Sequence, residues 1–301
     1  MRISERLSKY LPEIKYHIIN EKNVDSLGLL GCMCDKSLCS FIEDEKYLAE
    51  IVDNIHMLFI KQELLETVQL ENMGYIIVDQ PRLTFFQLHN ALKEYKEYVR
   101  PSFDTEIDST ATISKFASIS NKNVKIGKNV VVEPFVTIYE NTVIEEDCII
   151  RSGARIGGVG FEYKRKDDKI FSVEHLGGTV LESNVEVQNN TCIDRAIYPW
   201  DDTIIGEYTK VDNLIHVGHG VKIGRCCLLV AQVGIGGRTL VGNDVWLGVG
   251  STIRNGISVG NGARVNMGSV VTKDVPENGS VTGNFAIPHE AFIENLKSIK
   301  K

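Results

Sequence analysis

Two histidines stand three residues apart in the run VDNLIHVGHGVKIG, residues 211–224. His219 is a candidate general base, because an imidazole titrates near neutral pH and can take a proton from a nucleophile. Asp212 lies seven residues earlier. A carboxylate on the second ring nitrogen would fix the tautomer of the base and stabilise its protonated form. His216 is either a substrate contact or a polar residue at a turn, and the sequence leaves both open.

The chain around these histidines has a period of six. A helix of 3.6 residues per turn cannot keep one face apolar at this spacing, whereas short strands joined by tight turns can. We therefore expect a β-helix whose coils each contain three short strands, with the repeated aliphatic residue pointing inward. These aliphatic residues are Ile126, Val132, Ile138, Ile144, Ile150 and Ile156 in a first run, and Ile205, Val211, Val217, Ile223, Leu229, Ile235, Val241, Leu247, Ile253, Val259 and Val265 in a second.

The first hundred residues lack this period and read as a small α/β domain. Residues 43–55 are expected to form a helix with an apolar stripe, residues 57–60 and 75–78 to form short buried strands, and Pro81 to open a further helix. The predicted fold is mainly β. It comprises an α/β domain over 1–103, a β-helix over 104–286 and a C-terminal helix over 287–301.

Two segments interrupt the period of six. Residues 157–178 form an excursion with a charged run, and residues 197–202 break a later coil. Insertions of this kind gather on one face of a solenoid, commonly the binding face. His175 lies in the longer excursion and is expected on the surface.

Composition excludes several classes of function. A net charge of -7 argues against a general nucleic-acid binder, and no apolar run reaches the length of a membrane helix. The first residues lack the features of a signal peptide, so a cytoplasmic location is expected. None of the seven cysteines forms a set at zinc-binding spacing. We expect reduced thiols, no metal site and no tightly bound cofactor.

The order of a small α/β domain, a hexapeptide solenoid and a terminal helix resembles the UDP-3-O-acylglucosamine N-acyltransferase family. The strings SFIEDEKYL, IGGVGFEY, VEVQNNTCIDRA and DDTIIGEYTKVDNLIHVGHGVKIG carry the resemblance. It implies a left-handed β-helix and a homotrimer with active sites between adjacent solenoids. It also implies transfer of an acyl group from acyl carrier protein to the amine of a UDP-linked sugar, in the lipid A pathway. The departures described below add acyl-CoA as a donor and a surface glycan as a product.

The resemblance also assigns roles to residues. His219 matches the general base and Asp212 the carboxylate that supports it. Ile257 stands where the family has a second histidine, so a backbone N–H of Gly236 or Gly237 is expected to bind the oxyanion. Substrate contacts are expected from Phe41, Asp44 and Tyr47 around the base of the nucleotide, and from Phe161 and His216.

Departures from the family pattern leave the substrates open. Asp44 replaces an asparagine, so a uracil base is not assured, and the tail is shorter than the extension the family uses to engage acyl carrier protein. The ending GNFA resembles the GNPA of coenzyme A-dependent sugar N-acyltransferases. Both acyl donors therefore stay open, as does another nucleotide-linked amino sugar.

Two other classes of function compete. A γ-type carbonic anhydrase needs three histidines around zinc, but only His216 and His219 cluster here. A non-enzymatic scaffold solenoid would carry a flat face of repeated threonines, and none recurs at a constant repeat position.

Overall fold

The computed structural model describes residues 1–32, 34–68, 70, 72–283 and 286–299. The chain forms two compact units. The first contains Met1–Asp104, Val159–Gly178 and Arg195–Asp202, and the second contains Thr105–Gly158, Thr179–Asp194 and Thr203–Lys301. Both segments that interrupt the period of six therefore group with the first unit rather than with the solenoid.

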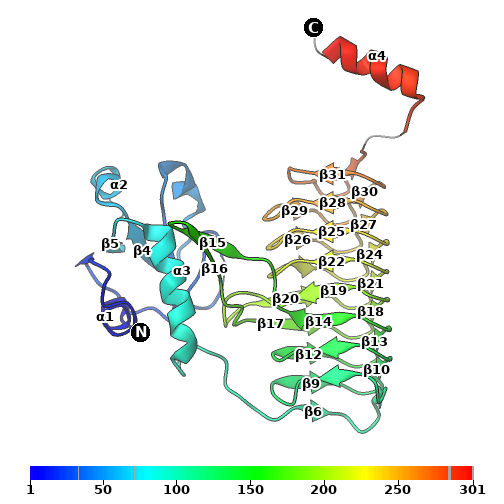
Figure 1. Ribbon diagram of the computed structural model, residues 1–301, viewed down its shortest axis with the longest axis horizontal. Coiled ribbons are helices and arrows are strands. Elements are labelled where there is room, and N and C mark those ends of the chain that lie inside the picture. Colours follow the sequence, from blue (N-terminus) through cyan, green and yellow to red (C-terminus); the bar gives the residue numbers. More distant parts are fainter. Residues whose placement is uncertain (33, 69, 71, 284–285, 300–301) are drawn as a thin grey trace. The chain divides into compact units, whose positions relative to one another are not determined.

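The second unit is a parallel β-helix with three faces, whose strands stack coil upon coil (Figure 1). Face 1 contains β7 (Thr112–Ile113), β10 (Val131–Val132), β13 (Ile149–Ile150), β18 (Glu186–Val187), β21 (Lys210–Val211), β24 (Leu228–Leu229), β27 (Trp246–Leu247), β30 (Arg264–Val265) and β32 (Ser280–Val281). Face 2 contains β8 (Ser118–Ile119), β11 (Thr137–Ile138), β14 (Arg155–Gly158), β19 (Cys192–Asp194), β22 (His216–Val217), β25 (Gly234–Ile235), β28 (Thr252–Ile253) and β31 (Val270–Val271). Face 3 contains β6 (Glu106–Ile107), β9 (Val124–Ile126), β12 (Thr142–Ile144), β17 (Gly178–Leu181), β20 (Asp202–Ile205), β23 (Lys222–Ile223), β26 (Leu240–Val241) and β29 (Ser258–Val259).

The period of six is the register of this solenoid. Val217 pairs with Ile193 in the preceding coil and with Ile235 in the next, and all three side chains are fully buried. The compact residue four positions later is also buried, as Val221 and Cys227 show. Burial of these columns supplies the hydrophobic driving force for stacking the coils, and it confirms the predicted β-helix.

The first unit is built on a five-stranded sheet in the order β1-β5-β4-β3-β2. Strand β1 is antiparallel to its neighbour β5, while the other pairs are parallel. Its elements are α1 (Ile3–Tyr10), β1 (His17–Ile19), β2 (Ser26–Leu27), β3 (Leu38–Phe41), β4 (Ile55–Ile60), α2 (Gln62–Thr67), β5 (Gly74–Ile77), α3 (Pro81–Ala91), a 3-10 turn (Leu92–Glu94) and the hairpin of β15 (Tyr163–Lys166) and β16 (Lys169–Ser172). The predicted strands and the helix that opens at Pro81 are confirmed.

The helix expected over residues 43–55 is wrong. A 3-10 helix covers only Glu45–Glu50, capped by Asp44, whose side chain accepts a hydrogen bond from the Lys46 N–H. Ile51 is already extended, and Ile55 begins β4 as a buried residue. The apolar residues of the predicted stripe belong to two different elements, the 3-10 helix and β4, and they fall at helical spacing by coincidence. Pairing of β4 with its neighbouring strands keeps Ile55 in the sheet and out of a helix.

The two segments outside the solenoid supply core residues to the first unit. Tyr198 is 3% exposed, and the Trp200 indole N–H donates to the Leu27 carbonyl at 2.9 Å. His175 was expected on the surface, but it is 4% exposed and its Nδ1 lies 2.9 Å from the Val173 carbonyl oxygen. That expectation was wrong because the excursion folds into a packed hairpin region instead of a solvated loop.

Helix α4 (His289–Ile299) lies in the region expected to be helical. Asn284 and Phe285 of the GNFA ending lie outside the described residues. Among the helices of the described ranges, none is both long and apolar enough to cross a bilayer.

Candidate active site

His219 lies in a turn between face 2 and face 3, which we call the His219 corner. The turn follows β22 and precedes β23. At the same corner of the two preceding coils, after β14 and after β19, the chain runs into the segments that belong to the first unit. His219 is 7% exposed, and the neighbouring Gly220 N–H donates to the Thr203 hydroxyl at 2.8 Å. The insertions therefore depart from the solenoid at the corner that holds the histidine.

The imidazole of His219 lies against the backbone of the next coil. A Cβ built on Gly237 would lie 2.7 Å from both Cε1 and Nε2 of His219, so only glycine leaves room for the ring. The Gly236 N–H donates to the Ile253 carbonyl at 2.9 Å and is engaged in the ladder. Within the part of the chain that the structure describes, the Gly237 N–H has no acceptor. Of the two amides named from the sequence, that of Gly237 is therefore the one not engaged in the ladder.

A carboxylate that sequence reasoning missed accompanies the histidine pair. The Oδ2 atom of Asp194, at the end of β19, lies 3.7 Å from Nε2 of His216. Burial raises the pKa of the Asp194 carboxyl, while the nearby charges of His216 and His219 act in the opposite direction. The string CIDRA contained this aspartate, but only the coil-to-coil register reveals that it faces the histidines.

Asp212 does not lie at the His219 corner. It follows β21, in the turn from face 1 to face 2, and the whole of β22 separates that turn from His219. Its Oδ1 accepts hydrogen bonds from the Asn213 N–H at 2.7 Å and the Asn213 side-chain amide at 2.7 Å, and its Oδ2 accepts from the Ala231 N–H at 3.0 Å. The structure therefore places Asp212 and His219 at different corners of one coil.

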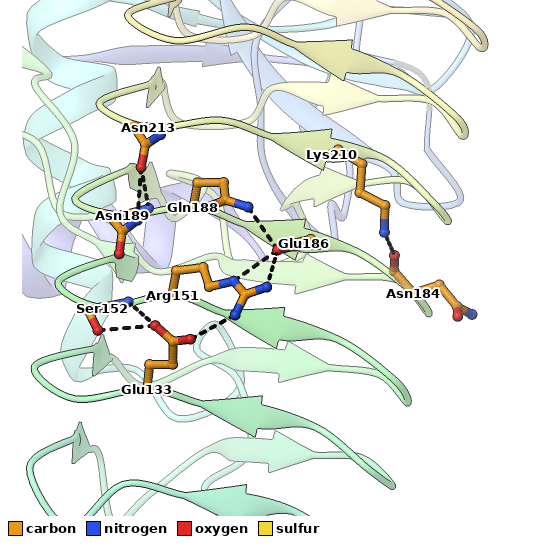
Figure 2. Close-up of polar contacts among 9 residues, drawn as sticks. All are labelled: Glu133, Arg151, Ser152, Asn184, Glu186, Gln188, Asn189, Lys210 and Asn213. Carbon is orange, nitrogen blue, oxygen red and sulfur yellow. Dashed lines mark hydrogen bonds and ion pairs between the residues drawn. The ribbon is translucent and has the colours of Figure 1, made fainter.

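A polar ladder orders the corner that presents Asp212 (Figure 2). The Arg151 guanidinium donates to Glu133 of the coil below at 2.8 Å and to Glu186 of the coil above at 2.7 Å. The backbone and side-chain amides of Asn189 both donate to the Asn213 side-chain oxygen at 3.0 Å. Asn213 thus links Asn189 of the preceding coil to the Asp212 carboxylate and fixes the direction of that carboxylate.

The residues expected around the nucleotide base belong to the first unit. Phe41 ends β3, and its ring centroid lies 5.0 Å from that of Phe85, so much of the ring is core. Asp44 accepts from the Lys46 ammonium at 2.7 Å, and this hydrogen bond lowers the pKa of its carboxyl. Tyr47 is 41% exposed, and the Lys46 ammonium lies 4.9 Å from its ring centroid. The loop therefore offers an exposed ring and a carboxylate side by side.

The other two residues singled out from the sequence have contrasting surroundings. Phe161 is 84% exposed, with its ring centroid 4.8 Å from that of Tyr163. Ile257 is 8% exposed and belongs to the solenoid core. The side chain of Ile257 points into the solenoid core. A histidine at this position would therefore point inward too, away from the space around His219.

The described ranges contain no group of three or more His, Cys, Asp or Glu side chains arranged to hold a metal ion within one chain. All seven cysteines are free thiols, and Cys39, Cys148 and Cys227 are buried.

Comparison with known protein families agrees with the repeat pattern. A family model described as bacterial transferase hexapeptide (six repeats) matches residues 123–158, and one described as hexapeptide repeat of succinyl-transferase matches residues 238–273. The solved structure of the UDP-N-acetylglucosamine acyltransferase of Francisella novicida matches with a TM-score of 0.50 and 24% identity, covering 64% of this chain and 71% of that one. The fold is a left-handed parallel β-helix.

Two curated relatives match this chain by sequence. A UDP-3-O-acylglucosamine N-acyltransferase of Helicobacter pylori is 32% identical over 309 residues, which cover 96% of this chain and 89% of that protein. A probable UDP-3-O-acylglucosamine N-acyltransferase 2, mitochondrial, of Arabidopsis thaliana is 38% identical over 153 residues, which cover 50% of this chain and 49% of that protein.

Proposed function

The chain belongs to the UDP-3-O-acylglucosamine N-acyltransferase family, and from this premise we propose which groups carry out its reaction and which substrates it takes. As a member of that family it is an N-acyltransferase that acts on a nucleotide sugar. The proposed reaction moves an acyl group from acyl-CoA or acyl carrier protein to the amine of a nucleotide-linked amino sugar, in the synthesis of lipid A or a surface glycan. We propose that the enzyme acts in the cytoplasm.

The observation that carries the mechanism is the position of His219 against Gly237. The sugar amine attacks the thioester carbonyl, and a C–N bond forms while His219 takes a proton from the nitrogen. The Gly237 N–H donates to the oxygen of the tetrahedral intermediate. Collapse of this intermediate breaks the C–S bond, and the imidazolium returns the proton to the departing thiolate. Amide and free thiol are the products.

Asp212 enters this mechanism through a neighbouring copy. Face 2 separates the His219 corner from the Asp212 corner. A threefold axis facing face 2 would bring each copy's His219 corner to the next copy's Asp212 corner. The outward residues of face 2 in the later coils favour close approach because, apart from His216, they are small or aliphatic: Cys192, His216, Gly234, Thr252 and Val270. We therefore propose a homotrimer with one site at each junction.

The first unit supplies the proposed nucleotide site through Phe41, Asp44, Tyr47 and Phe161. The Asp44 carboxylate accepts hydrogen bonds but donates none, whereas an asparagine amide does both. A base that offers N–H groups suits it better than a base edge that also presents an oxygen.

Two other functions were open from the sequence. A carbonic anhydrase-like metal site receives no support within one chain from the described residues. A scaffold role conflicts with membership of an enzyme family at 32% identity over 96% of the chain.

The test is a thiol-release assay. Acyl-CoA and acyl carrier protein donors would be paired with a panel of UDP-, dTDP- and GDP-linked amino sugars, with His219→Ala as the control. Thiol release with one pair, lost in the variant, supports the proposal and names both substrates. Release that survives in His219→Ala would remove His219 as the base, and no release with any pair would remove the proposed substrate class.

A further inference from the structure

Asp194 ends β19 one coil before His219, and the mechanism above does not use it. Its backbone pairs with Gly158 of the coil below. In the coil above, Cys192 pairs with His216 and Ile193 with Val217, so the residue beside Asp194 is Gly218. Neither neighbour carries a side chain, so the carboxylate is free to turn toward the imidazoles.

Two imidazoles act on this carboxylate. Asp194 Oδ2 lies 3.7 Å from His216 Nε2, and His219 is close enough to act on it electrostatically. Cys192 lies on the same strand. The nearest guanidinium on β14, that of Arg155, donates instead to the carbonyls of Phe135 and Gly153 at 2.8 and 2.6 Å. The Asp194 side chain is 11% exposed, whereas that of His216 is 55% exposed.

We propose that Asp194 is a positioning residue for the base. Its carboxylate holds the imidazoles of His216 on β22 and of His219 in the following turn, and it stabilises the positive charge that His219 gains when it takes the proton of the amine. Unlike Asp212, it does so from within the same chain. This inference rests on the proposed function.

The burial of Asp194 is costly for the fold, which favours a role in chemistry. Because burial raises the pKa of this carboxyl in the folded state, the folded protein binds the proton more tightly than the unfolded chain does. The free energy of unfolding therefore rises as the pH falls through the folded pKa, and the ionised form lowers it at neutral pH. A carboxylate with only a structural role would instead stabilise the fold.

The first test is Asp194→Asn, which removes the charge and keeps the shape. We expect kcat/KM to fall roughly tenfold or more, but by less than the loss of the base itself, about 10²–10⁴. The melting temperature at neutral pH should stay equal or rise. Asp244→Asn, the same change at an exposed turn between faces 3 and 1, is the control and should alter neither quantity. A lower melting temperature with unchanged kcat/KM would overturn the proposal.

A second test separates His219 from His216. In a His216→Gln background, Asp194→Asn should still lower kcat/KM by a similar factor, because the charge acts on His219 directly. No additional loss would show that Asp194 serves only the His216 ion pair and would overturn the proposal.

A readout without substrate keeps this inference distinct from the proposed function. In ¹⁵N NMR spectra of histidine-labelled protein, the ring nitrogens of His219 should shift in Asp194→Asn and not in Asp244→Asn. Unchanged signals would overturn the positioning role. If no substrate is turned over, these signals still decide whether Asp194 orients the histidine.

Discussion

His219 and His216 differ in their surroundings rather than in their chemistry. His219 is 7% exposed and packs on the Gly237 backbone, whereas the His216 side chain is 55% exposed on face 2 of the solenoid. A base works best where its ring is fixed and water is largely excluded. The family resemblance already singled out His219 as the base, and the neighbouring coil supplies the physical difference between the two histidines.

Replacing His219 by alanine should reduce kcat about 10²- to 10⁴-fold, the range expected for loss of a positioned base. The fold should survive, since the residue lies at a turn and outside the hydrophobic columns. Steady-state thiol release and circular dichroism measure the two effects. His56→Ala, at an exposed position of β4, is the control.

Gly237→Ala tests the contact beneath the ring. The new Cβ would lie 2.7 Å from two atoms of the His219 imidazole, so the ring must move away from its productive position. We expect kcat to fall tenfold or more, because small displacements at a reacting centre are costly.

Gly256→Ala is the control at the same corner of the next coil. It has a φ of +69° but nothing within 4 Å of its Cβ, so it should cost about 1 kcal/mol of stability and no activity. Equal kinetics in the two variants would contradict the proposed geometry.

At the scale of elements, the period of six allowed prediction of the β-helix because it is the stacking register itself. No comparable signal marked the segment over residues 43–55, where the spacing was helical but tertiary pairing of Ile55 in β4 prevailed. Nor could the sequence show that residues 197–202 pack in the core of the first unit, because that contact joins Trp200 to Leu27, far apart in the chain.

The inward and outward positions of the solenoid strands can be tested with one pair of leucines. Leu247 is fully buried in β27, and Leu240 is 52% exposed in β26. Leu247→Ala should lower the free energy of unfolding by about 2–5 kcal/mol because it leaves a cavity between coils. Leu240→Ala should change it by less than about 0.5 kcal/mol. Urea unfolding measures both, and equal costs would show that the register is wrong.

His89 makes the first unit sensitive to acid. Its ring is fully buried, with Nδ1 2.9 Å from the Tyr98 hydroxyl, and burial lowers its pKa to about 4. Between pH 6.5 and 4 the unfolded chain takes up a proton that the folded unit does not. Stability should therefore fall by about 3 kcal/mol as the pH drops through this window.

The measurement follows Trp200 fluorescence during urea unfolding of a Trp246→Phe protein, at pH 7 and at pH 4.5. In His89→Gln the part of the pH dependence that comes from this residue should vanish. A slope unchanged by the substitution would assign the acid sensitivity to other groups.

At the scale of the whole molecule, the proposed site joins residues of two copies. Asp212 and His219 sit at opposite ends of face 2, so the pairing implied by the family resemblance is proposed to form between neighbouring copies. The period of six places residues that are seven apart at different corners of the solenoid, but no sequence pattern states how copies meet.

The most direct measurement of the central claim is subunit complementation. Asp212→Ala and His219→Ala chains would each be purified, unfolded together in equal amounts, refolded and assayed for thiol release. If each site takes His219 from one copy and Asp212 from the next, about a quarter of all junctions in randomly assembled trimers contain both wild-type residues. The account predicts that the mixture recovers about a quarter of wild-type activity while each parent alone stays nearly inactive. A mixture no more active than its parents, or a protein that sediments as a monomer, would contradict it.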